Sequence, residues 1–135
     1  MLDDIVATKQ QEVEHAKGEI PLEELKERLA NHFTERSFAK AIHQPGKLSL
    51  IAELKRKSPS KGMLRERFEP VSLAQQLQGA GASALSVLTD EAYFGGHLEF
   101  LRDVKQFTEL PVLRKDFIVD PYQVIMTVTV NFQLQ

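Results

Sequence analysis

The apolar residues in the first third of the chain recur at helical intervals and predict two helices. One stripe lies before Gly18, with Asp3 and Asp4 near its N-terminal end, where the helix dipole favours acidic side chains. Pro21 then opens a second segment. Its apolar stripe consists of Leu22, Leu25, Leu29 and Phe33. Together with the RSFAKAI segment that follows, these elements predict a helical extension over residues 1–47.

From residue 48 onward, short apolar runs alternate with segments of helical period. The runs end at turn residues or at charged residues, as strands do. Strands are therefore expected at residues 48–55, 84–89 and 111–115. Helices are expected on the outside of the sheet near residues 72–79 and 98–107. This alternation with short links predicts an α/β fold of parallel βα units, which we place at residues 48–125.

Two local signals predict the ends of the first of these helices. Ser72 and Gln75 have the spacing of a capping box, which marks a helix N-terminus. Gly81 permits the sharp turn from the helix into the next strand. The helix is therefore expected to begin at Ser72 and to run to about Gly79.

The last ten residues, 126–135, have the period of a strand. From Met126 to Gln135, apolar residues alternate strictly with Thr, Asn and Gln. We therefore expect residues 126–134 to be extended or disordered rather than regularly helical, although the preceding DPYQV favours a helix start. Residues 126–135 are interpreted as a divergent tail.

Charged residues lie at the ends of two predicted strands. Alternate residues of a strand share a face, so Glu53 and Lys55 lie together on the first strand. Lys115 ends the third strand, and the carboxyl ends of barrel strands are where βα barrels build active sites. A solvated ion pair of Glu53 with Lys55 is the alternative. The opposite face of the first strand is wholly apolar and is expected to be covered: Leu48, Leu50, Ala52 and Leu54.

Three further features each allow a functional and a structural interpretation. The basic stretch 55–61, which includes the hydroxyl of Ser58, is either a phosphate-binding loop or a basic surface patch. Gly95 and Gly96 either offer backbone N–H groups to a phosphate or form a turn. Phe94 is either the wall of a pocket or part of the cover of the core.

Composition narrows the class of protein and of partner. The 135 residues are 42% apolar and 27% charged, and a net charge of −2 gives no general attraction to nucleic acid or to an anionic membrane. No apolar segment approaches the roughly 20 residues of a membrane-spanning helix. The sequence has no cysteine, which fits a reducing cytoplasm, and its four histidines lack metal-ligand spacing. We therefore expect a cytoplasmic protein that binds neither nucleic acid nor membrane.

Three motifs, in this order and at this spacing, resemble the indole-3-glycerol-phosphate synthase family of tryptophan biosynthesis. They are IAELKRKSPSKG, SVLTDEAYFGG and PVLRKDFIVDPYQ. The resemblance covers roughly residues 1–124 and implies a (βα)8 TIM barrel, of which this chain would hold about three βα units. It implies a carboxy-lyase that converts a phosphorylated small molecule, 1-(2-carboxyphenylamino)-1-deoxyribulose 5-phosphate, to indole-3-glycerol phosphate. Carbon dioxide and water are released, and no metal or organic cofactor takes part.

The resemblance also implies roles for single residues. Lys115 corresponds to the general acid at the ketone oxygen of the substrate. Lys55 corresponds to the lysine that contacts the substrate carboxylate and assists the acid chemistry, and Glu53 to the acidic partner beside it. The remaining matches are substrate contacts, a serine after the first strand and two aromatic residues around the anthranilate ring: Ser58, Phe94 and Phe117.

The end of the chain departs from the family's pattern. After DPYQV the sequence does not resemble the family, and 135 residues are fewer than the ~200 that a complete barrel needs. The family's later half supplies a catalytic glutamate, an asparagine, a serine and a glycine-rich phosphate site. We therefore expect a truncated synthase that retains half an active site and is inactive alone. The alternative is a non-enzymatic protein, either a pseudogene product or a half-barrel that acts as an assembly partner. A weaker alternative is a phosphate-sugar or nucleic-acid binder that uses the SPSKG loop, although the low overall charge argues against nucleic acid. The open edge of the third strand is expected to invite self-association.

Overall fold

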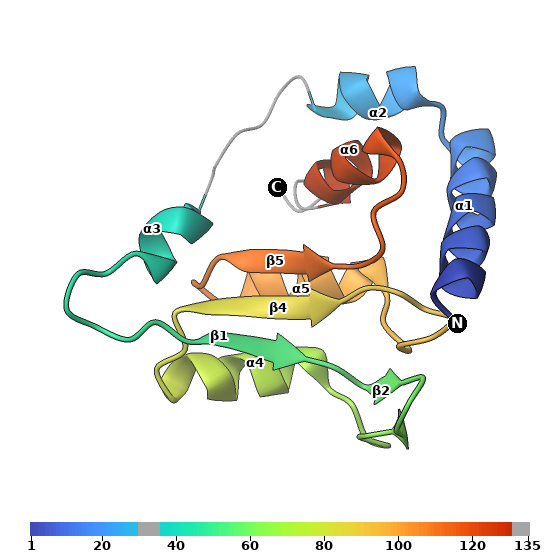
Figure 1. The fold of residues 1–135 in the computed structure, drawn as a ribbon. Coiled ribbons are helices and arrows are strands. Elements are labelled where there is room, and N and C mark those ends of the chain that lie inside the picture. The colour runs from blue at the N-terminus through green and yellow to red at the C-terminus, as the bar shows by residue number, and fades with distance from the viewer. Residues whose placement is uncertain (30–35, 131–135) are drawn as a thin grey trace. The chain divides into compact units, whose positions relative to one another are not determined.

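The computed structural model describes residues 1–29 and 36–130 (Figure 1). The chain forms two compact units, one of residues 34–116 and one of residues 1–33 together with 117–135. Each unit is considered by itself below. The division of the sequence into a helical extension, a partial barrel and a tail stays a prediction.

Three parallel strands form the sheet of the unit 34–116, in the order β1-β4-β5. The strands are β1 (Ile51–Leu54), β4 (Ala84–Leu88) and β5 (Val112–Lys115). Leu54 pairs with Val87, and Leu88 pairs with Lys115, so the carboxyl ends of the strands lie side by side. The predicted adjacency and parallel direction of these strands are confirmed. All five residues of β4 are buried, as expected for a continuous apolar strand in the middle of a sheet.

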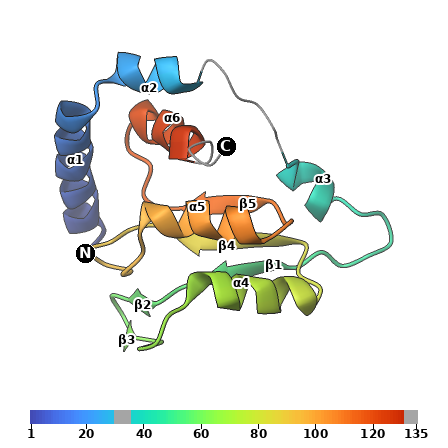
Figure 2. The same cartoon turned by 180° about the vertical axis from the view of Figure 1, so that it is seen from behind.

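Two helices cover one face of this sheet, as Figure 2 shows from behind. They are α4 (Pro70–Gly79), which packs on β1, and α5 (Leu98–Phe107), which packs on β5. The core between helices and strands is aliphatic, because each element turns its apolar side chains inward. It consists of Ala52, Leu54, Ala74, Ala82, Leu85, Val87, Leu101 and Val104. A short helix, α3 (Phe38–Ile42), precedes the sheet and is capped by the Ser37 hydroxyl.

The prediction that Ser72 begins the first of these helices is wrong. The helix begins at Pro70, after Glu69 as the N-cap residue. Ser72 lies inside the helix, where its Oγ accepts a hydrogen bond from Gln76 Nε2 at 3.2 Å. A proline favours the first turn because its fixed φ suits a helix and its missing N–H would have no intrahelical partner there. The proline signal therefore dominates the capping-box spacing.

The first strand is shorter than its apolar pattern predicts. Leu48 and Leu50 were expected on a covered face, yet both side chains are exposed. The partner strand β4 begins at Ala84, opposite Ile51, so residues before Ile51 have no strand beside them. Of the four residues expected on that face, Ala52 and Leu54 are buried.

A small antiparallel hairpin follows β1 where the sequence predicts only a loop. It consists of β2 (Lys57–Ser58) and β3 (Gly62–Met63). The Ser58 hydroxyl accepts a hydrogen bond from the backbone N–H of Lys61 at 3.2 Å, which stabilises the turn. Gly62 has a positive φ of 68°, a conformation that other residues rarely adopt.

The second unit is helical. It contains α1 (Leu2–Glu19), α2 (Leu22–Leu29) and α6 (Pro121–Val130), so the predicted helices of the first third are confirmed except at Phe33, which lies outside the described residues. Its core is formed by Val13, Leu25 and Tyr122. The Tyr122 hydroxyl, which lies 2.9 Å from the Ala16 carbonyl and 2.7 Å from the Ile20 carbonyl, joins α6 to the end of α1.

The expected extended tail is wrong over residues 126–130, which continue α6. The helix start is held by a reciprocal cap: Asp120 Oδ1 accepts from Tyr122 N, and Gln123 Oε1 accepts from Asp120 N. The threonines of the alternating stretch also fit the helix, because the hydroxyls of Thr127 and Thr129 donate to backbone carbonyls four residues earlier. The inherited helix start therefore outweighs the strand period. Residues 131–134 lie outside the described part of the chain.

Candidate active site

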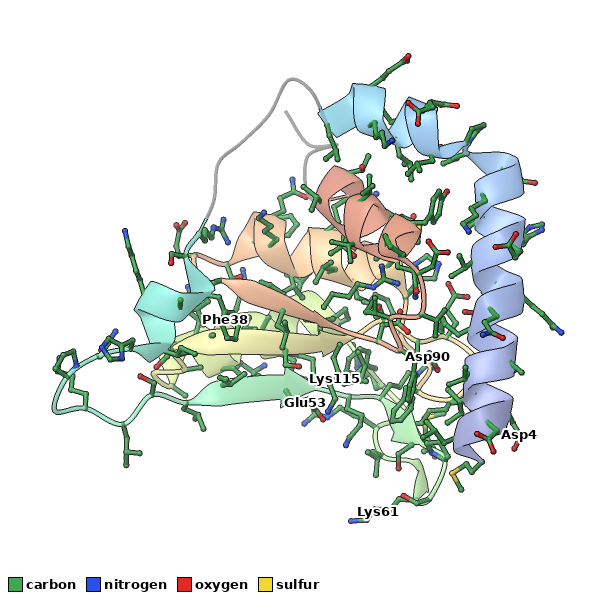
Figure 3. All side chains as sticks on the ribbon, turned by 45° about the horizontal axis from the view of Figure 1, so that its top comes forward. Asp4, Phe38, Glu53, Lys61, Asp90 and Lys115 are labelled. Atoms are coloured by element: carbon green, nitrogen blue, oxygen red, sulfur yellow. The ribbon has the colours of Figure 1, made fainter. Side chains whose placement is uncertain are left out.

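Three charged side chains meet at the carboxyl ends of β1 and β5. Lys115 Nζ lies 2.5 Å from Glu53 Oε2, and Lys55 Nζ lies 3.2 Å from Glu53 Oε1. Figure 3 shows Glu53 and Lys115 side by side, from strands that are separated by β4. Each oxygen of the Glu53 carboxylate is therefore paired with the ammonium group of one lysine. The predicted convergence of these three residues, which we call the charged triad, is confirmed, and their chemical roles remain to be tested.

The electrostatics of the triad centre on Glu53. Partial burial would raise the pKa of its carboxyl, but hydrogen bonds from Lys115 and Lys55, and the positive charge of both, hold that pKa below its ordinary value. The carboxylate side chain is 30% exposed, and that of Lys115 is 50% exposed. The triad is thus half-solvated, open to a ligand, and anionic at its centre with a cation on either side.

We expect Glu53→Gln to reduce stability in a pH-dependent way. Because the folded-state pKa of Glu53 is lowered, its stabilising contribution is fully present above the unfolded pKa of about 4.3 and is lost as the pH falls through the folded pKa. For a partly solvated ion pair the contribution at neutral pH is ~1 kcal/mol or less. Urea unfolding at a series of pH values should show the two chains converging in acid. Glu66→Gln, at an exposed position, serves as the control, and an equal loss there or a pH-independent loss at Glu53 would contradict the pairing.

The basic stretch after β1 divides into residues with different partners. Lys57 donates from Nζ to the Ala92 carbonyl at 3.0 Å and from its backbone N–H to the Phe94 carbonyl at 3.3 Å. These two hydrogen bonds of Lys57 connect the loop after β4 to the hairpin. Lys61, at the turn of the hairpin, is exposed and points away from the triad in Figure 3. Lys57 acts structurally here, so residues 55–61 do not present all their charges to one ligand.

The phosphate interpretation of Gly95 and Gly96 is not supported. The N–H of Gly95 donates to the Glu91 carbonyl at 3.0 Å, and that of Gly96 to the Asp90 carbonyl at 2.7 Å. A Cβ atom on Gly96 would lie 2.2 Å from the Leu88 carbonyl oxygen, so this position requires glycine for close packing. The two glycines build a turn whose amide groups are already bonded.

The three predicted substrate contacts are partly buried. Ser58 lies in β2, the hairpin strand that follows β1 in the chain. Phe94 lies in the loop after β4, where its backbone N–H is bound by Asp90 Oδ2 at 3.2 Å. Phe117 belongs to the helical unit, where its carbonyl accepts from Gln123 Nε2 at 2.9 Å. Their contact with a substrate stays a prediction.

Sequence reasoning missed a buried polar network behind the triad, formed by Thr89, Arg114 and Asp116. Arg114 Nη2 lies 2.7 Å from Asp116 Oδ2, and the Thr89 hydroxyl donates to the same oxygen at 2.7 Å. The side chains of Arg114 and Asp116 are 8% and 1% exposed. The available signal was strand alternation, which places Arg114 on the face of β5 opposite to Lys115.

Neither a metal site nor a membrane span is found in the described part of the chain. Within residues 1–29 and 36–130, no three His, Asp or Glu side chains are grouped so that they could hold a metal ion. His97 instead caps α5, where its Nδ1 accepts from the backbone N–H of Glu99 at 3.1 Å. None of the helices described is both long and apolar enough to cross a membrane.

These features define a class. An α/β unit with parallel strands, helices on one face of the sheet and a charged cluster at the carboxyl ends of the strands is consistent with part of a TIM-barrel domain.

Comparison with known proteins identifies the family. The sequence model of indole-3-glycerol phosphate synthase matches residues 2–133. The indole-3-glycerol phosphate synthase of Geobacillus kaustophilus (strain HTA426) is 50% identical over 125 residues, which cover 92% of this chain and 45% of that protein. That of Neisseria meningitidis serogroup B (strain ATCC BAA-335 / MC58) is 46% identical over 127 residues, 92% of this chain and 49% of that protein. That of Campylobacter fetus subsp. fetus (strain 82-40) is 40% identical over 124 residues, 92% and 48% of the two chains.

The chain belongs to the indole-3-glycerol phosphate synthase family. It spans about half the length of the curated relatives it matches. The family match runs to residue 133 and therefore extends beyond residue 124, where the motif resemblance ends. Residues 126–130, which looked divergent in sequence, are thus part of the matched region and carry a helix.

Proposed function

We propose that this chain supplies one half of an indole-3-glycerol-phosphate synthase active site, on about three βα units of a (βα)8 barrel. The reaction converts 1-(2-carboxyphenylamino)-1-deoxyribulose 5-phosphate to indole-3-glycerol phosphate, carbon dioxide and water, and we place it in the cytoplasm. The observation that carries the proposal is the charged triad at the carboxyl ends of β1 and β5. The names of the matched relatives support the reaction.

In this proposal the two lysines act on opposite ends of the reacting group. Lys115 protonates the ketone oxygen as the new ring bond forms, because this oxygen then becomes a hydroxyl group that can leave as water. Lys55 holds the substrate carboxylate until it leaves as carbon dioxide. Glu53 bonds to both ammonium groups, so it positions two like charges close together that would otherwise repel each other.

The surrounding residues are assigned to substrate binding. Ser58 donates a hydrogen bond from its hydroxyl, and Phe94 and Phe117 enclose the anthranilate ring. Apolar walls around a few polar groups are typical of small-molecule sites. The hydrogen bonds of Lys57 to the loop after β4 support this assignment for Phe94, because they hold its backbone next to the hairpin that carries Ser58.

The role of Lys55 can be tested with N-methylanthranilate, which contains the carboxyphenylamino group of the substrate. We expect its addition to the 15N-labelled chain to shift the backbone amide signals of Glu53 and Lys55. In Lys55→Met these shifts should be lost, because the carboxylate then has no ammonium partner. Lys40→Met, on the exposed side of α3, is the matched control. Equal shifts with N-methylaniline, which lacks the carboxylate, would show that Lys55 does not hold this group.

We also propose that the chain associates with itself in the absence of a partner polypeptide. Within residues 1–29 and 36–130, the outer edges of β1 and β5 pair with no further strand. On the face that carries the triad, Ile51 and Leu113 are 44% and 47% exposed. Open edges and exposed apolar side chains favour association. Sedimentation should show a mass that increases with concentration, and a monomer throughout a hundredfold range would contradict this.

A further inference from the structure

Three consecutive residues, Arg114 and Lys115 at the end of β5 and Asp116 just after it, are all bonded to Thr89, the residue that follows β4. The backbone N–H of Thr89 donates to the carbonyl of Lys115 at 3.0 Å. Its hydroxyl accepts from Arg114 Nε at 2.9 Å and donates to Asp116 Oδ2 at 2.7 Å. A threonine hydroxyl has one proton to donate and lone pairs to accept, so both contacts can be made at once.

The hydrogen bonds of Thr89 restrain the backbone on both sides of Lys115. Arg114 and Asp116 are its chain neighbours, and their side chains are joined to each other on the face of β5 opposite to the triad. Because both side chains are buried, the ion pair offsets its desolvation cost only if its geometry is favourable and its remaining polar atoms are hydrogen-bonded. The hydroxyl of Thr89 supplies two of these hydrogen bonds. Lys115 itself is half-exposed, and its long side chain has many rotamers. A fixed backbone is therefore needed to direct its ammonium group to Glu53.

We propose that Thr89, through Arg114 and Asp116, is a positioning residue for Lys115. It sets the carboxyl end of β5 in register with β4, so that the ammonium group of Lys115 reaches the carboxylate of Glu53 across the middle strand. This inference rests on the proposed function for its catalytic meaning. The geometric part, that Thr89 controls the Lys115–Glu53 contact, can be tested without turnover.

The test uses Thr89→Val and Thr89→Ser in the chain of 135 residues. Valine keeps the shape and the backbone N–H but removes the hydroxyl, whereas serine keeps the hydroxyl. Arg114 and Asp116 are left intact, because removing either member of a buried pair leaves an unpaired charge and endangers the fold. The readout is the pKa of Glu53, from a 13C NMR titration of the glutamate carboxyls. The groups that face Glu53 among the described residues are Lys55 and Lys115.

In the unchanged chain and in Thr89→Ser, we expect Glu53 to titrate below its ordinary pKa. In Thr89→Val, its pKa should rise toward the ordinary value, because Lys115 no longer holds its place, while the 15N–1H spectrum still shows a folded sheet. An unchanged Glu53 pKa in Thr89→Val would overturn the positioning role, as would complete unfolding, which would make Thr89 a residue of general stability. An ordinary Glu53 pKa in the unchanged chain would instead contradict the triad and with it the proposed function.

Discussion

Alone, the chain of 135 residues is expected to show no measurable turnover of 1-(2-carboxyphenylamino)-1-deoxyribulose 5-phosphate. These 135 residues span about half the length of the curated relatives that they match, so in this experiment solvent would take the place of the other half of the proposed barrel. Loss of a single positioned acid–base group typically costs ~10²–10⁴-fold in rate. Loss of the groups that bind the phosphate removes the alignment of the reacting atoms as well.

The measurement is the fluorescence of the indole product at high protein concentration over many hours. A heat-unfolded sample of the same chain gives the uncatalysed background. Saturable turnover above that background would show that the described half of the site is sufficient, and it would contradict our view of the triad as one part of a larger site.

In a mixture with the complementary half of a relative, Lys115→Ala is expected to reduce turnover strongly. The complementary half is the part of the relative that follows the matched region. Because Lys115 is proposed to protonate the ketone oxygen, its loss should lower kcat by ~10²–10⁴-fold. KM should change much less, since the phosphate and the carboxylate of the substrate would still be bound. Steady-state kinetics at saturating complementary half separates the two parameters.

Two further variants make this result specific. Lys40→Ala, at an exposed position of α3, should keep the kcat and KM of the unchanged mixture. Lys55→Ala should raise KM together with a loss in kcat, because the carboxylate is then held less well. A Lys115→Ala mixture with a kcat within tenfold of the unchanged one would exclude Lys115 as the general acid.

Strand direction, strand order and the helices of the sheet could be predicted from the sequence because they depend on local period and on topology. The largely apolar run of β4 indicated a strand buried on both faces, and the alternation of elements indicated parallel pairing. The extent of β1 could not be predicted, since Leu48 and Leu50 have the same apolar character as Ala52 and Leu54. The two pairs of residues differ in whether a partner strand lies beside them. β4 begins opposite Ile51, and no sequence pattern predicts the residue at which a partner strand begins.

The tail shows a competition between two local signals. Alternation from Met126 onward favoured a strand, whereas Asp120 and Gln123 have the spacing of a reciprocal helix cap. The cap dominates because Thr127 and Thr129 can bond their hydroxyls to the preceding turn, which makes β-branched residues acceptable in the helix. The correct prediction required reading these threonines as helix-compatible residues.

The triad could be predicted from the alternation of side chains along a strand. Glu53, Lys55 and Lys115 lie on the same face of the sheet, at the carboxyl ends of their strands. The network of Thr89, Arg114 and Asp116 could not, because Thr89 lies in the loop after β4 and no local pattern pairs its hydroxyl with Arg114 and Asp116. In the sequence alone, Arg114 and Asp116 could belong to the same charged site as their neighbour Lys115. The structure shows that Arg114 and Asp116 neutralise each other on the far face.

The most direct test of the proposed active site is the titration of this chain with the complementary half of a relative, followed by product fluorescence. We expect no turnover from either half, and turnover that rises with the added half and saturates as the two polypeptides become fully associated. Formation of a stable complex that binds the substrate but produces no indole-3-glycerol phosphate would contradict the claim that Glu53, Lys55 and Lys115 supply the acid chemistry of a synthase active site.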